Sequence, residues 1–197
     1  MNNLAAIVEQ IQSQMNDLEQ KRELSLSMSR QIVRKTKRII HALHLGQDYD
    51  GMMQEARAEM VALQEALEGH PQILYSGAVN DAMMELAETA LLIAVTENQP
   101  LPSPEELRIA PASWVLGLGD SIGELRRIAL DLLRQDETAR AEEVLRSMED
   151  LFSALLEFDS PDAILPARRK QDIARSLVER TRADVTTGAM MRRSRLE

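Results

Sequence analysis

The stretch RELSLSMSRQIVRKTKRIIHALH, residues 22–44, decides the fold class. It contains no Gly or Pro, and its apolar residues recur at the three- and four-residue spacing of an amphipathic helix. The same spacing extends back to residue 4, so one long helix, or two helices in line, is expected over residues 4–44. Gly46 and the turn-forming residues 47–51 then end this helix.

The rest of the chain shows the same helical spacing, interrupted by Gly- and Pro-containing breaks. Helices are expected over residues 52–68, 72–97, 112–135, 137–157 and 165–187, with a short one at 105–107. No alternating run is long enough for a strand, and no linker is long enough to separate domains. The sequence therefore predicts an all-α, single-domain bundle of about six to seven helices. This domain covers residues 1–189, and a flexible basic tail covers residues 190–197.

Composition excludes several classes of protein. The chain has 197 residues, 44% of them apolar, which is enough to bury a full core. Because cysteine is absent, a disulfide framework, a thiolate zinc site and a cysteine nucleophile are excluded. The longest apolar run, residues 90–95, is far shorter than the roughly 20 residues of a membrane span. The first residues lack the basic region of a signal peptide, so a cytoplasmic protein without a membrane partner is expected.

The charges are strongly segregated along the chain. The net charge of −9, taken alone, argues against nucleic acid as a ligand. However, residues 21–44 hold seven Lys or Arg and one acid, whereas residues 45–107 hold one Arg and twelve acids. Residues 168–195 again are basic, with nine Lys or Arg and three acids. Because electrostatic potential is local, the basic segments remain candidate binding surfaces for an anionic polymer.

One face of the first helix carries a basic row, and the opposite face is apolar. The row occupies about a third of the helix circumference and consists of Arg30, Arg34, Lys37, Arg38, His41 and His44. On the other side lie Ile32, Ile39, Ile40 and Leu43. Such a row suits a phosphate backbone, because the Arg guanidinium binds phosphate through two parallel hydrogen bonds. The alternative is a solvated polar face whose charges pair with acids on a neighbouring helix.

Two carboxylate pairs stand at helical spacing. Glu85 and Glu88 are three residues apart, and Asp120 and Glu124 are four apart, so each pair shares a helix face. Like charges so placed repel, and a cation would relieve the repulsion. An all-oxygen set without a paired His suits Mg²⁺ or Mn²⁺ rather than zinc or copper. The alternative is that these are ordinary exposed acids, because 32 acidic residues make such spacings frequent.

Three glycines surround the second carboxylate pair: Gly117, Gly119 and Gly123. Glycine within a helix is less favourable than Ala by about 1 kcal/mol, so their presence indicates that the backbone approaches something closely. The neighbour is either a ligand or another helix packed tightly against this one. A helix that begins later, at Asp120 or Ser121, is a further alternative.

Several segments resemble the translin superfamily. Residues 22–44 are similar to its basic first helix, and GLGDSIGELRRIALDLL, residues 117–133, resembles its Asp- and Glu-containing segment. MMELAETALL, residues 83–92, is similar to the Glu-x-x-Glu helix, and residues 165–170 match the start of the last helix in place and character. The resemblance covers most of the chain in the same order, although the acidic net charge and the tail depart from it.

The resemblance implies a particular branch of the superfamily. Translin binds RNA and single-stranded DNA as a shell-like oligomer, whereas translin-associated factor X carries a Mg²⁺-dependent endoribonuclease site of four acids. Its pattern, Glu-x-x-Glu with Asp-x-x-x-Glu, is complete here as Glu85, Glu88, Asp120 and Glu124. The chain therefore resembles the translin-associated factor X branch, in the short prokaryotic or archaeal-type form that assembles without a separate translin partner.

The expected protein is an endoribonuclease that cuts single-stranded RNA inside a homo-oligomeric shell, with an octamer-like shell as one arrangement. The four acids hold Mg²⁺ or Mn²⁺ as metal ligands and catalytic residues, in a site of one or two ions. RNA phosphates are held by Arg30, Arg34, Lys37, Arg38 and His41, with little preference for sequence. Enclosing the basic surface leaves an acidic exterior, which explains the net charge of −9. Candidate apolar contacts between copies are the Met residues of the second and third helices, whose alternative role is core filling: Met52, Met53, Met60, Met83 and Met84.

Two other functions remain open. A non-catalytic, translin-like oligomer that binds RNA or single-stranded DNA would be favoured if the four carboxylates formed ion pairs with Arg108, Arg126 or Arg127. A helical interaction protein that binds no nucleic acid would show no salt-sensitive RNA binding.

Overall fold

The chain folds as a helical bundle, as the sequence predicts. The computed structural model describes residues 3–196, with side chains through Arg193, and in that range it contains helices and no strand. The eight helices are α1 (Leu4–His44), α2 (Asp50–Ala66), α3 (Pro71–Leu74), α4 (Gly77–Thr96), α5 (Pro104–Leu107), α6 (Pro111–Arg134), α7 (Thr138–Leu156) and α8 (Arg168–Leu196). The number within the described range exceeds the predicted six to seven because the helix expected over residues 72–97 is divided into α3 and α4.

Two of the predicted helices differ from those observed. The single helix expected over residues 72–97 is divided into α3 and α4, because Ser76 is extended and Asn80 donates a hydrogen bond to the Tyr75 carbonyl at the break. The last helix, expected over residues 165–187, begins at Arg168 and continues to Leu196. The described part of the predicted tail, residues 190–196, is therefore helical rather than frayed. Glu197 and the side chains after Arg193 lie outside the described residues.

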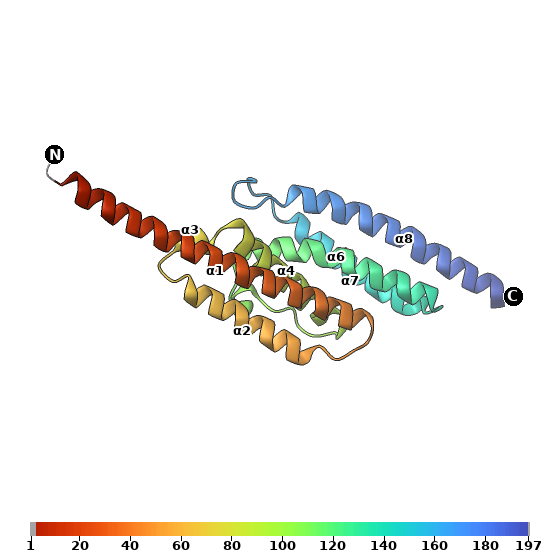
Figure 1. Cartoon of the computed structure of the whole chain (residues 1–197). Coiled ribbons are helices and arrows are strands. Elements are labelled where there is room, and N and C mark those ends of the chain that lie inside the picture. Colours follow the sequence, from red (N-terminus) through yellow and green to blue (C-terminus); the bar gives the residue numbers. More distant parts are fainter. Residues whose placement is uncertain (1–2, 197) are drawn as a thin grey trace.

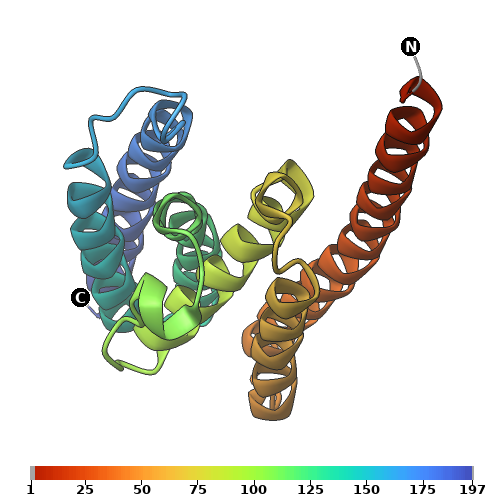
Figure 2. The same cartoon turned by 90° about the vertical axis from the view of Figure 1, so that its left-hand side faces the viewer.

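The helices form two packed groups that meet where α4 packs on α6, as Figures 1 and 2 show. On one side, α1 packs on α2 and α4. On the other side, α7 and α8 pack on α6 and on each other, and α6 packs on α4. Each group has its own buried core, and α4 contributes residues to both, for example Leu86 to the first and Leu91 to the second. The contact between α4 and α6 therefore joins the two halves.

α1 is one continuous helix whose apolar face is buried as predicted. Ile32 and Ile39 are fully buried, and Ile40 is nearly so. The Lys35 ammonium contacts carboxylate oxygens of Glu55 and Glu59 on α2 at 2.7 and 2.6 Å. These hydrogen bonds raise the pKa of Lys35 and lower the pKa of Glu55. Lys35 is thus a structural residue that fixes α2 against α1.

A close backbone crossing sets the position of α6 on α4. A Cβ placed on Gly117 would lie 2.6 Å from the backbone oxygen of Met84 and 2.7 Å from Cβ of Ala87. No side chain fits at that separation, so Gly117 permits the two helices to touch. Gly123, by contrast, has only an ordinary contact with Leu177, at 3.8 Å. Tight helix packing is therefore the reason for glycine at residue 117.

The first third of α1 leaves the bundle as an arm. Every residue from Asn3 to Asp17 is exposed, and Figure 2 shows this stretch projecting beyond the other helices. Its large apolar side chains recur at helical spacing and are 43–58% exposed: Leu4, Ile7, Val8, Ile11 and Met15. An exposed apolar stripe of this kind is typical of a contact surface, so the arm is a candidate site of contact with another chain.

Four of the five Met residues expected to contact another copy lie in or against the core of one chain. Met60 and Met83 are buried, and Met52 and Met53 pack against the first core cluster. These four fill the core, the alternative that the sequence left open, whereas Met84 is only partly buried and lines a hollow between α1 and α4. Within the described residues, none of the helices combines the length and apolar character needed to cross a membrane.

Candidate functional site

The crossing of α4 and α6 brings the two predicted carboxylate pairs together. Glu85 and Glu88 stand on α4, one turn apart, and Asp120 and Glu124 stand on the facing side of α6. Glu88 feels the charges of Asp120, Glu85 and Glu124, and Glu85 feels that of Asp120. Because Gly117 lies one turn before Asp120, the same close contact that joins the helices also places the four acids.

Glu88 is the acid most affected by this environment. Its side chain is mostly withdrawn from water, and burial raises its pKa from 4.5 to about 8, with the three neighbouring carboxylates adding to the rise. The nearby Lys170 opposes the rise without cancelling it. Burial also raises the pKa of Glu85, and Lys37 acts in the opposite direction. The raised pKa favours the protonated form of Glu88, and a cation bound among the carboxylates would oppose this effect.

Asp120 has a cationic partner on a helix distant in the sequence. The Lys170 ammonium donates hydrogen bonds to both oxygens of the Asp120 carboxylate, the one to Oδ2 measuring 2.6 Å. Lys170 lies in the first turn of α8, and its Cβ would be 3.0 Å from a Cβ at Gly119. The second glycine of the segment therefore allows α8 to place this lysine against the acid.

Glu124 has a partner on α1. Nε2 of His44 lies 2.6 Å from Oε2 of Glu124, and the His44 side chain is only 4% exposed. Arg127, on the same helix as Glu124, is more distant at 3.9 Å. His44 was expected in the exposed basic row, but its side chain is turned into the bundle. The partners of the quartet are thus the Lys170 ammonium and the His44 imidazole, and of the arginines considered from the sequence only Arg127 makes a weak contact.

The five predicted RNA-binding residues are all exposed on α1: Arg30, Arg34, Lys37, Arg38 and His41. Four of them line two hollows beside the carboxylates. Arg30 and Arg34 line the first, and Lys37 and His41 line the second. Arg38 lies closer to α2, where its charge lowers the pKa of Glu55. The basic row therefore follows the edge of the acidic cluster, apart from Arg38.

The second hollow is lined by residues of both the basic row and the acidic cluster. It has a volume of about 380 Å³. Its walls are Lys37, Ile40, His41, Glu85, Glu88, Glu124 and Arg127. Carboxylates on one side and cationic side chains on the other form a site that suits a phosphate together with a divalent cation.

The donor set fits such a cation by its chemistry. Four carboxylates supply hard oxygen ligands, and their mutual repulsion at Glu88 is what a divalent cation would relieve. Across the residues that the structure describes, no group of three or more His, Asp or Glu side chains is placed to hold a metal ion as it stands. Lys170 and His44 occupy oxygens of Asp120 and Glu124, so ligation requires these contacts to open.

The roles of Lys170 and His44 were not found from the sequence. Lys170 is 50 residues from Asp120, and His44 is 80 residues from Glu124. Only the packing of α8 and α1 on α6 makes them neighbours. The sequence signals were weak: Lys170 ends a basic triplet, residues 168–170, and His44 falls at the border of the basic row. Trp114, six residues before Asp120, packs partly buried against the core, and its Nε1 donates a hydrogen bond to the Pro102 carbonyl at 2.8 Å.

Comparison with known proteins places the chain in a family. An uncharacterized protein of Methanocaldococcus jannaschii, MJ0175, is 32% identical over 169 residues, which cover 84% of this chain and 75% of the relative. The fold is similar to that of AfC3PO in a complex with duplex RNA, with a TM-score of 0.79, 30% identity and coverage of 94% and 97% of the two chains. The apo-NeC3PO structure has the same fold, with a TM-score of 0.81 at 21% identity over 92% and 96% of the chains. The model of the Translin family matches residues 6–183, and the chain belongs to that family.

Proposed function

We propose that this protein is a divalent-metal-dependent endoribonuclease that binds RNA and works as a homo-oligomer. It belongs, in this proposal, to the catalytic, translin-associated factor X-like branch of its family. The observation that carries the proposal is the environment of Glu88. Three other carboxylates surround it, and its pKa is raised to about 8. Burial is the main cause of this rise and the neighbouring carboxylates add to it, and a carboxyl perturbed in this way is typical of a functional site.

Glu85, Glu88, Asp120 and Glu124 would hold Mg²⁺ or Mn²⁺. When bound, the ion supplies an activated water and stabilises charge on the phosphate oxygens. The chain's own cationic residues bind and orient the RNA backbone. Lys37 and His41 line the same hollow as three of the four acids, Glu85, Glu88 and Glu124, so they would hold the phosphate nearest the site. Arg30 and Arg34 extend this contact along α1 by charge.

RNA is the favoured substrate because a similar protein binds it. AfC3PO, 30% identical to this chain, forms a complex with duplex RNA. Single-stranded RNA is the substrate that the sequence resemblance implies, and single-stranded DNA is a second ligand. Direct comparison of single-stranded and duplex substrates therefore belongs in the assay. The proposed location is the cytoplasm.

The arm of α1 supports assembly into a closed, octamer-like shell. Its apolar stripe, Leu4 to Met15, is exposed in a single chain and has the spacing of a helix–helix contact. Burying it against another copy would leave the acidic surfaces outside. The basic row and the acids then face an interior where RNA is held.

A specific observation favours the second candidate, an RNA-binding oligomer that does not cut. Lys170 already neutralises Asp120, and His44 already contacts Glu124. If these contacts persist when Mg²⁺ is supplied, the acids are structural and the basic row binds RNA without catalysis.

Incubation of the purified full chain with labelled RNA separates the two candidates. Single-stranded and duplex RNA are each mixed with protein in Mg²⁺, in Mn²⁺ or in EDTA, and both cleavage and binding are measured. The proposal expects salt-sensitive binding in all three solutions and cleavage only with the metal ions. Binding without cleavage in any solution would establish the non-catalytic candidate, and absence of both would reject nucleic-acid function altogether.

A further inference from the structure

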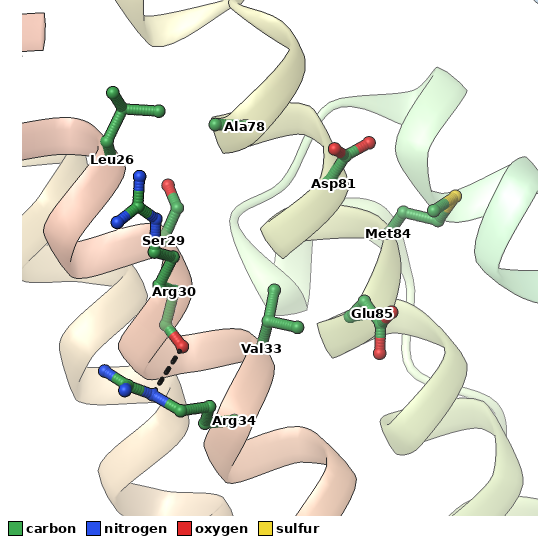
Figure 3. A pocket seen from close by; sticks show the side chains of 9 residues that line it. All are labelled: Leu26, Ser29, Arg30, Val33, Arg34, Ala78, Asp81, Met84 and Glu85. Atoms are coloured by element: carbon green, nitrogen blue, oxygen red, sulfur yellow. Dashed lines mark hydrogen bonds between the residues drawn. The ribbon is translucent and has the colours of Figure 1, made fainter.

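The first of the two hollows, which Arg30 and Arg34 line between α1 and α4, lies directly beside the acidic site. It has a volume of about 400 Å³, within the size range of small-ligand pockets. Its walls, labelled in Figure 3, are Leu26, Ser29, Arg30, Val33, Arg34, Ala78, Asp81, Met84 and Glu85. Glu85 belongs to both hollows, so a chain that crosses the acidic site also passes the mouth of this recess. Neither the proposed metal site nor the packing of the buried core accounts for this recess.

The walls of the recess differ in chemistry. Leu26, Val33 and Met84 provide an apolar surface that is only partly covered. Arg30 and Arg34 stand on the α1 side, and Nε of Arg34 donates to the Arg30 carbonyl at 3.2 Å, the bond drawn in Figure 3. This bond fixes the base of the Arg34 guanidinium along the helix, at the rim. The positive charge of the two arginines at the rim attracts phosphates, whereas the interior of the recess is apolar.

The opposite rim carries negative charge. Asp81 is exposed on α4, and its charge adds to the rise in the pKa of Glu85. A nucleotide backbone is repelled from this side and attracted to the arginine side. This difference in charge between the two rims orients the phosphates toward α1, so that the groups attached to the phosphates point into the recess.

One polar group in the wall lacks a partner. Ser29 is only 2% exposed, and among the described residues its hydroxyl has no hydrogen-bond partner. An unsatisfied buried hydroxyl is unfavourable, because it has lost its bonds to water without replacement. A ligand with polar atoms on its edge and an apolar face would complete this wall.

From these observations we infer that the recess receives a nucleobase of the bound RNA, from the nucleotide next to the phosphate at the acids. A base has two apolar faces, which suit Leu26, Val33 and Met84, and it has hydrogen-bonding edges, which suit Ser29. Arg guanidinium planes at the rim are a known stacking surface for unpaired bases. The inference rests on the proposed RNA function and adds to it a base subsite that phosphate contacts alone do not provide.

The test compares RNA with and without bases, using the full chain in EDTA to prevent cleavage. The probes are a labelled 12-nucleotide single-stranded RNA and a ribose–phosphate chain of the same length that carries no bases. Fluorescence anisotropy at fixed salt gives the Kd of each. Wild type is expected to bind the base-bearing RNA about tenfold more tightly, an effect of the size that a stacked base produces.

Two variants locate the effect. Ala78→Phe fills the recess without changing charge, so the base-bearing RNA should bind no better than the chain without bases, whose Kd stays as in wild type. Ser29→Ala removes the unpaired hydroxyl at little change in volume, and it should weaken only the base-bearing RNA, by about threefold. Ala139→Phe, which adds the same ring at an exposed position of α7, is the control and should leave both Kd values unchanged.

The outcomes separate this inference from the proposed function. Equal wild-type affinity for both probes would overturn the base subsite while leaving RNA binding intact. Failure of wild type to bind either probe would reject the proposed function as well. If Ala78→Phe changes the particle mass by light scattering but not the preference for bases, another copy of the chain covers the recess and the inference is wrong.

Discussion

Lys170 of α8 donates hydrogen bonds to both oxygens of the Asp120 carboxylate on α6, with 2.6 Å between its ammonium nitrogen and Oδ2. The two residues are 50 positions apart, and their side chains are about one-quarter exposed. A positive charge therefore already stands where the proposal places a metal ion. Either Lys170 or a bound divalent cation can neutralise the Asp120 carboxylate. The first prediction follows from the competition between the two.

Replacing Lys170 should make the fold depend on metal. Lys170→Met leaves Asp120 unpaired beside Glu88, so the free energy of unfolding in EDTA should fall by about 1–2 kcal/mol, because the pair is partly solvated. Mg²⁺ should then raise the Tm of the variant more than that of wild type. The matched control is Arg182→Met, which removes the exposed ion pair of α8 with Glu149. An equal response to Mg²⁺ in both variants would contradict a metal site at Asp120.

The raised pKa of Glu88 predicts how stability depends on pH. The pKa of the Glu88 carboxyl is near 4.5 in the unfolded chain and about 8 in the folded chain. As the pH rises, the unfolded chain therefore loses this proton at a lower pH than the folded chain does. The contribution of Glu88 to stability is therefore neutral below about pH 4.5 and becomes progressively unfavourable up to about pH 8. In EDTA, Glu88→Gln should be more stable than wild type by about 2–4 kcal/mol at pH 8, and the difference should disappear near pH 4.5. Urea unfolding across this range measures it, and a pH-independent difference would show that Glu88 is not perturbed.

The glycine at the helix crossing predicts a paired result. Gly117→Ala forces its Cβ against the Met84 oxygen, which lies only 2.6 Å away, so α4 and α6 must separate. A loss of about 1–3 kcal/mol in unfolding free energy is expected, as for other overpacked sites. Gly123→Ala meets nothing closer than 3.8 Å and should be neutral or stabilising by up to about 1 kcal/mol. Because helix propensity alone favours Ala over Gly, a gain in stability from both substitutions would contradict a close crossing at residue 117.

The arm of α1 predicts the basis of assembly. A double substitution, Ile7→Asp with Ile11→Asp, places charges on the apolar stripe and should lower the particle mass measured by light scattering. Circular dichroism should stay close to that of wild type, because both side chains are about half exposed in the single chain. Ser13→Asp adds a charge on the opposite face of the arm and serves as the control. An unchanged mass in the double variant would assign assembly to another surface.

Much of this architecture could be predicted from local sequence. Three features follow from the spacing of nearby residues, and the structure agrees with them. They are the long helix over residues 4–44, the Pro-rich break at residues 99–104 and the two carboxylate pairs. The division of residues 72–97 lies at Tyr75 and Ser76, directly before Gly77, and was missed because a single glycine within a helical pattern does not by itself end a helix. The extended last helix was missed because its end has few apolar residues.

The partners of the site could not be predicted, because they depend on how helices pack. Lys170 and His44 reach Asp120 and Glu124 only after α8 and α1 settle on α6. Likewise, Ala78 and Met84 form a recess with Leu26 only at the observed register of α4 on α1. The exposure of the arm could not be predicted either, because an apolar stripe does not show whether its own chain or another chain covers it.

The most direct test of the central claim is single-turnover cleavage of labelled RNA in Mg²⁺, with binding measured on the same samples. Wild type is compared with Asp120→Asn and Glu85→Gln, and with Glu149→Gln as a control acid on α7, where Glu149 pairs with Arg182. The account predicts that both quartet variants lose at least about a hundredfold in cleavage rate while RNA affinity changes little, and that the control cuts normally. Cleavage at the wild-type rate by either quartet variant, or no cleavage by wild type, would contradict it.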